Sequence, residues 1–162
     1  MIKDRITLEE LKEEYSPLQK KYNLPKFEQL NEDFSIEKAT ETETEILIRE
    51  IRRFVGEKII NYLRFVEGLL NPVNGPMFVF SIIKILEPSE KQKLSDIYKE
   101  LVKQEIKFIE LDLEFDEKKE ADFIIEANKL WQDVKKDLLG ILEGVNNRWD
   151  NKSEGTNKGY FG

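Results

Sequence analysis

The chain contains no cysteine and no histidine. Their absence excludes disulfides, thiol nucleophiles, zinc fingers, histidine-dependent catalytic triads and histidine proton relays. Any catalysis would have to use carboxylates, lysine, arginine or hydroxyl groups. Glycine and proline are also scarce, at 8 and 5 of 162 residues, which excludes a collagen-like or low-complexity chain.

Long apolar runs are lacking as well. The longest run, residues 77–86, is far shorter than the ~20 residues that a membrane-spanning helix needs. The first ten residues contain no apolar centre of the kind found in a signal peptide. We therefore expect a cytoplasmic protein that does not enter a membrane.

Charged residues are abundant, and acidic ones predominate. They make up 36% of the chain, and the formal net charge is −7 with a sequence pI near 4.9. The overall charge therefore argues against sequence-independent binding to nucleic acids or to anionic membranes. Residues 46–76 are the only sizeable stretch with an excess of lysine and arginine, so a local basic patch stays open.

The spacing of apolar residues predicts an all-α protein. We expect a single helical-bundle domain over residues 1–150, with a short N-terminal helical arm and a long helix over residues 42–70. Two further long helices, over residues 89–113 and from residue 116 onward, are expected to form a long C-terminal antiparallel hairpin.

Local signals predict where several helices begin and end. Capping patterns are expected to open three of them, at Thr7 with Glu10, at Ser89 with Gln92, and at Asp116. Pro17 is expected to interrupt the first helix near Tyr15, because the residue before a proline disfavours helical geometry.

Two segments are harder to place. Residues 77–86 have the β-branched and aromatic content of a strand, but helices on both sides favour a short buried helix. This apolar segment is either a central helix or half of a dimer interface, so the oligomeric state stays open. Residues 151–162 form a polar segment that ends in Gly-Tyr-Phe-Gly, for which we expect a disordered, flexible tail.

Several carboxylates occupy positions where the helical pattern calls for apolar residues. Glu105, Asp112 and Glu120 would lie between the two C-terminal helices, and such a cluster could hold Mg²⁺ or Mn²⁺ for phosphate hydrolysis. The alternative is structural. Lys58 would form a salt bridge with Glu105, Asp112 would lie at a helix end, and Glu120 would stabilise a first helical turn.

Two features could bind a protein partner. Arg49, Arg52 and Arg53 are predicted to share the face of their helix opposite its apolar stripe, where they could meet an acidic partner or an RNA backbone. They could equally form ordinary surface pairs with nearby glutamates. Tyr160 and Phe161, at the end of the polar tail, could act as a docking peptide or fold back onto the bundle.

Several stretches resemble small all-α proteins of DPANN-type archaea, a group for which we know no activity. They are residues 24–30, 47–53, 71–78 and 116–123, together with the terminal Gly-Tyr-Phe-Gly. The resemblance implies an archaeal cytoplasmic protein and implies no reaction. Separately, Glu117-x-x-Glu120 is similar to a fragment of the acidic motif of MazG-like nucleotide pyrophosphohydrolases.

Taken together, these patterns favour a non-enzymatic helical interaction or adaptor protein, a subunit of an archaeal multiprotein assembly. Its predicted contact residues are Arg49, Arg52, Arg53, Tyr160 and Phe161, and it needs no cofactor. The alternative is a nucleotide phosphohydrolase that binds Mg²⁺ or Mn²⁺ through Glu105, Asp112 and Glu120.

Overall fold

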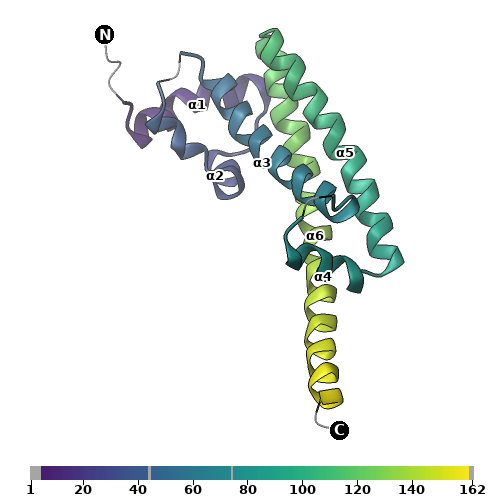
Figure 1. The fold of residues 1–162 in the computed structure, drawn as a ribbon. Coiled ribbons are helices and arrows are strands. Elements are labelled where there is room, and N and C mark those ends of the chain that lie inside the picture. The colour runs from purple at the N-terminus through teal and green to yellow at the C-terminus, as the bar shows by residue number, and fades with distance from the viewer. Residues whose placement is uncertain (1–4, 44, 74, 161–162) are drawn as a thin grey trace.

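The protein is an all-helical bundle (Figure 1). The computed structural model describes the backbone of residues 5–43, 45–73 and 75–160, and the side chains of these residues as far as Asn151. The helices are α1 (Leu8–Tyr22), α2 (Phe27–Phe34), the 3-10 helix η1 (Ile36–Glu41), α3 (Leu47–Leu70), α4 (Met77–Ile85), α5 (Pro88–Leu113) and α6 (Glu117–Tyr160). No strand occurs within the described ranges.

The N-terminal arm consists of α1, α2 and η1. The predicted capping box is confirmed, because the backbone N–H of Thr7 donates to the Glu10 carboxylate at 2.9 Å and Glu10 N–H donates to the Thr7 hydroxyl at 3.2 Å. The predicted interruption at Pro17 is wrong, since α1 runs through it. Proline removes one hydrogen bond, to the carbonyl of Glu13, and Glu13 is exposed so that water can satisfy that group.

Polar contacts attach this arm to the last helix. The Asp33 carboxylate of α2 accepts a hydrogen bond from Gln132 at 2.8 Å and forms an ion pair with Lys135 at 2.9 Å. Burial raises the pKa of Asp33, but these two donors outweigh it and hold that pKa below its usual value. The carboxylate therefore stays ionised and keeps α2 against α6 at neutral pH.

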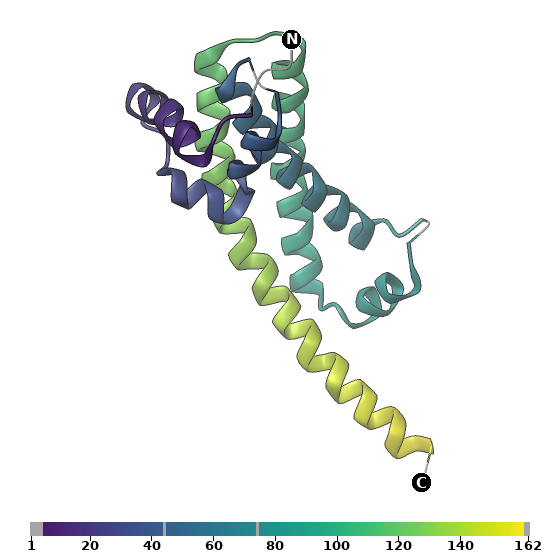
Figure 2. The same ribbon diagram turned by 90° about the vertical axis from the view of Figure 1, so that its left-hand side faces the viewer.

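Helices α5 and α6 form the predicted antiparallel hairpin, and α3 packs against both (Figures 1 and 2). The cap at Asp116 is confirmed, because its carboxylate accepts the Lys119 N–H at 3.0 Å. The start of α5 differs from the prediction. Its cap is Glu87, which forms a capping box with Glu90, and Pro88 takes the first helical position, where a missing N–H costs nothing.

The main core lies between these three helices. Its members are buried aliphatic and aromatic residues that recur at helical spacing, among them Ile51, Val55, Ile59, Leu63, Val66, Leu94, Leu101, Ile124, Ala127 and Trp131. At one point α3 and α5 approach so closely that a Cβ at Gly56 would overlap the ring of Phe108. The glycine is what allows the two helices to pack there.

Residues 77–86 differ in part from the prediction. The helix is confirmed as α4, but the expectation that it is buried is wrong. Along the described length of α4, Val79 alone is buried, whereas Met77, Phe78 and Phe80 are 89, 58 and 41% exposed. The reason is position, because α4 lies at the edge of the bundle and makes its main contacts with α3 and α6 (Figure 2).

Helix α6 continues beyond the end at Asp150 that the sequence predicts. Its backbone is helical to Tyr160, and its last part runs past α4 and the rest of the bundle (Figures 1 and 2). Extending an existing helix needs no new nucleation, and the segment contains no proline to stop it. The side chains from residue 152 onward lie outside the described residues, so the docking role of Tyr160 and Phe161 stays a prediction.

In the described part of the chain, none of the helices combines the length and the apolar character required to cross a bilayer.

Candidate functional site: an apolar groove between α4 and α6

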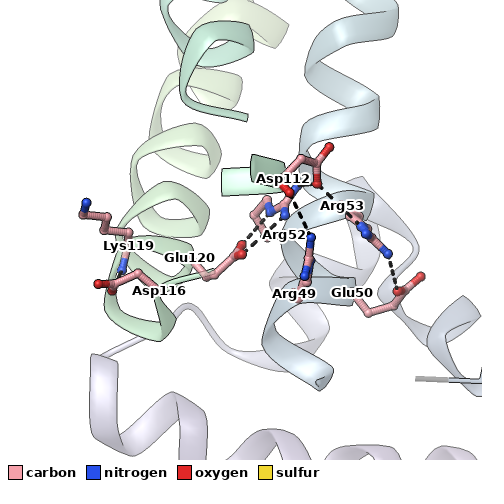
Figure 3. A network of polar contacts seen from close by, with 8 residues as sticks. All are labelled: Arg49, Glu50, Arg52, Arg53, Asp112, Asp116, Lys119 and Glu120. Atoms are coloured by element: carbon pink, nitrogen blue, oxygen red, sulfur yellow. Dashed lines mark hydrogen bonds and ion pairs between the residues drawn. The ribbon is translucent and has the colours of Figure 1, made fainter. Parts of the chain in front are cut away.

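Arg52 occupies the centre of a polar network between three helices (Figure 3). Its side chain is fully buried, and its Nε and Nη2 donate to the two carboxylate oxygens of buried Glu120, at 2.5 and 3.3 Å. Nη1 donates to Asp112 at 2.9 Å, and the Phe108 ring lies 4.7 Å from the guanidinium carbon. Arg52 thereby ties α3 to α5 and α6.

The prediction of an exposed face formed by three arginines is therefore wrong for Arg52. Because α5 and α6 both pack on α3, the buried face of α3 is wide enough to include this position. Arg49 is half-buried and donates to the backbone carbonyl of Asp112 at 3.2 Å, at the end of α5 where carbonyls have no partner in the helix. Arg53 remains exposed, 3.8 Å from Glu50 and from Asp112.

The predicted carboxylate cluster is divided between two structural roles. Asp112 and Glu120 do meet, but they meet on the guanidinium of Arg52. Glu105 lies elsewhere and pairs with Arg64 at 2.6 Å. Lys58 does not pair with Glu105 as the structural alternative predicted. Its ammonium lies over the rings of Tyr62 and Trp131, at 5.8 and 5.5 Å from their centroids.

These contacts leave the phosphohydrolase interpretation without support from a metal site. Among the residues that the structure describes, no group of three or more acidic side chains is placed to hold a metal ion. Each carboxylate oxygen that Arg52 or Arg64 engages would have to exchange a charged hydrogen bond for a metal bond.

A groove of about 740 Å³ lies between α4 and the distal part of α6. Its lining is almost wholly apolar and consists of Phe78, Ile82, Leu139, Leu142, Val145 and Trp149, with the polar Glu143 and Asn146. Leu139, Leu142 and Trp149 are 62, 40 and 46% exposed. Large apolar side chains that remain in water on one face of a protein indicate a binding surface.

Sequence reasoning identified only one wall of this groove. Residues 77–86 were recognisable as a candidate interface from their apolar composition. The other wall was missed because the exposed apolar residues of α6 lie next to its buried ones in the sequence. Together they resemble a single broad face that packs on the core. The available signal was a second stripe, Leu139, Leu142, Asn146 and Trp149, which has the spacing of a helix-pairing seam.

Arg148 holds the two walls together. Its Nε donates to the carbonyl of Ile85, at the end of α4, at 2.8 Å. Its other nitrogens reach both members of the capping box at the start of α5, with Nη1 3.3 Å from Glu87 and Nη2 hydrogen-bonded to Glu90. One side chain of α6 therefore fixes the junction between α4 and α5, and with it the width of the groove.

Replacing Arg148 with methionine is expected to loosen α4. The variant loses a hydrogen bond to Ile85 and leaves the half-buried Glu90 without its cation, and bonds of this charged type contribute about 1.5–3 kcal/mol each. Amide hydrogen exchange in residues 77–86 is expected to accelerate by about tenfold or more, while exchange in the core of α3 changes little.

Arg64→Met is the matched control for this experiment. Arg64 pairs with Glu67 and Glu105 but is 58% exposed, so its loss should cost less than about 1 kcal/mol. Exchange in residues 77–86 should stay at the wild-type rate in this control. Equal acceleration in both variants would mean that Arg148 has no special role in positioning α4.

Comparisons with protein-family models, with curated proteins and with solved structures find no match for this chain, so its function has to be inferred from its residues and their geometry.

Proposed function

We propose that the protein is a non-enzymatic helical interaction protein, a subunit of a multiprotein assembly, that docks a protein chain in the groove between α4 and α6. The observation that carries the proposal is the set of large apolar side chains left in water on these two helices. Those that line the groove are Phe78, Leu139, Leu142 and Trp149.

The exposed apolar area in the groove is comparable to the largest apolar patch of a typical monomer. Large side chains of this kind bury roughly 150–250 Å² each, so the exposed fractions of these four correspond to on the order of 400 Å². Patches of this size are often functional. Aromatic residues contribute half of the set, and aromatic residues are enriched among the hot spots of protein interfaces.

The chemistry of the groove favours a protein ligand over a small polar one. Among the described residues that line it, Glu143 alone is charged, so a phosphate or carboxylate of a metabolite would meet no cation in this lining. The shape is an open trough between two helices, which suits the apolar face of a third helix. Arg49 and Arg53, at the other end of the bundle, remain a proposed second contact surface for an acidic partner.

Photo-crosslinking within the groove tests this function. A benzophenone amino acid in place of Phe78, in the full chain expressed in its source cell, is expected to form a covalent adduct with another polypeptide. Leu142→Glu, which places a charge in the centre of the groove, is expected to abolish that adduct, because an unpaired charge is costly to bury.

The control uses an exposed apolar residue on a different face. Ile109 on α5 is 52% exposed and does not line the groove. The crosslinker at position 109 should give no adduct that depends on Leu142. Failure to obtain any polypeptide adduct from position 78, including one with a second copy of the chain, would refute the proposed function.

A further inference from the structure

We infer that the chain docked in the groove is a second copy of this protein, so that the protein is a symmetric homodimer in which the two α6 helices pack antiparallel. The inference rests on the proposed function, since it names the partner of the same surface. Three features of the groove support it: the spacing of its residues, its area and its scarcity of charge.

The exposed stripe on α6 has the same spacing when it is followed in either direction, as a two-fold symmetric antiparallel pair requires. Leu139, Leu142, Asn146 and Trp149 are separated by three, four and three residues. A two-fold axis level with position 144 would therefore place Leu139 opposite Trp149 of the partner subunit, and Leu142 opposite Asn146 of the partner subunit. A symmetric interface requires this self-complementarity, because each residue must find its counterpart on an identical surface.

The area suits an interface of this kind. A standard protein–protein interface buries about 800 Å² on each partner. The exposed apolar side chains that line the groove supply on the order of 400 Å² of this, and Ile82, Glu143 and Asn146 lie beside them in the lining. Helix α6 also runs beyond the rest of the bundle, which leaves its distal length open to an antiparallel partner (Figure 2).

Charge favours self-association through this face and opposes it elsewhere. Two molecules of net charge −7 repel each other, so a self-interface needs a face with few charges. Helix α4 has a single charged residue, Lys84, and the described lining of the groove also has one, Glu143. A symmetric interface through this groove therefore brings few like charges close together.

Asn146 interrupts the apolar stripe at one position. A polar residue in the seam of a helix pair lowers its stability. In the antiparallel alignment Asn146 faces Leu142 of the partner subunit, where its amide has no polar counterpart, and it therefore weakens the dimer. Asn146→Leu is expected to lower the dimer dissociation constant by about tenfold, since it replaces a polar group in the interface with an apolar one.

Mass measurement by light scattering on the full chain tests the dimer. The wild type is expected at twice the chain mass of 19.2 kDa at micromolar concentration. Leu142→Glu is expected to raise the dissociation constant by at least about 100-fold and so to give the monomer mass, because the dimer contains two such charges. Ile109→Glu is the matched control, and it should remain dimeric with an unchanged dissociation constant.

The absence of cysteine allows a direct test of orientation. Leu139→Cys and Trp149→Cys, prepared as separate proteins and oxidised, are each expected to give no covalent dimer. Mixed together they are expected to give a disulfide-linked dimer of the two variants. In the antiparallel alignment the two copies of position 139 lie about 15 Å apart along the paired helices, as do the two copies of position 149, which is too far for a disulfide.

Each outcome is decisive. A monomer at all concentrations, or a dimer that Leu142→Glu leaves intact, overturns the inference, and so does covalent dimer formation by either single cysteine variant alone. An unchanged dissociation constant in Asn146→Leu would place position 146 outside the interface and so contradict the inference. A monomer whose position 78 still crosslinks to a different polypeptide overturns the homodimer and leaves the proposed function standing.

Discussion

Replacing Arg52 with alanine is expected to destabilise the protein by several kcal/mol. The substitution leaves Glu120, which is fully buried, without the guanidinium that binds both of its oxygens at 2.5 and 3.3 Å. Removing one partner of a buried ion pair costs about 3–5 kcal/mol, because the remaining charge is neither solvated nor paired. The Phe108 ring also loses the group stacked on it.

The loss should appear as a fall in melting temperature on the order of 10 °C, given about 2–4 °C per kcal/mol for a chain of this size. Thermal unfolding followed by circular dichroism measures it directly. Arg53→Ala is the matched control, since it removes the same side chain from the adjacent position, where the arginine is 44% exposed and its partners lie 3.8 Å away. That variant should lose less than about 1 kcal/mol.

A double variant separates the penalty of an unpaired charge from the value of the pair itself. Arg52→Met combined with Glu120→Leu removes both buried charges and retains apolar volume, and such exchanges are often neutral or stabilising. We expect the double variant to be clearly more stable than Arg52→Ala. Equal loss in the two would show that packing, and not the charge on Glu120, dominates at this position.

The architecture could be predicted from the sequence because it depends mostly on local signals. Apolar residues recur at helical spacing along α3, α5 and α6. The connection that contains Asp116 is short, and two long helices joined by a short connection pack antiparallel. Caps at Thr7 and Asp116 were readable for the same reason, since each involves residues three positions apart. The prediction at Pro17 failed because the carbonyl that loses its hydrogen bond there belongs to an exposed residue. Water can bind that carbonyl, so the proline costs less stability than it would inside a buried helix.

The sequence placed Asp112 and Glu120 near each other, but it could not predict that Arg52 binds both of them, because Arg52 lies far from them in sequence. Arg52 and Glu120 are separated by 68 positions, and no periodicity connects them. The helical wheel of residues 42–70 places Arg52 on the face opposite the apolar stripe, and nothing in that segment alone indicates a buried partner. The same limit hid the groove, since each wall alone looks like a core-facing helix and only their placement shows that no described side chain covers them.

Gly56→Ala is expected to destabilise the protein even though alanine favours helix formation. The new Cβ would overlap two ring carbons of Phe108, so the ring or the helix must move. Overpacking of this kind costs about 1–3 kcal/mol, which exceeds the gain of about 1 kcal/mol from exchanging glycine for alanine in a helix. Urea unfolding should show a lower midpoint with an unchanged slope.

The same substitution in the same helix should have the opposite sign at Gly68. A Cβ there meets no described atom within 4 Å, so Gly68→Ala keeps the helical gain of roughly 0.5–1 kcal/mol without a clash. Adding Phe108→Leu to Gly56→Ala should cost less than the sum of the two single changes, because the smaller side chain relieves the contact. Additive losses would mean that the strain in Gly56→Ala does not come from the contact between the new Cβ and the Phe108 ring. The close approach of α3 to α5 would then not explain the loss of stability.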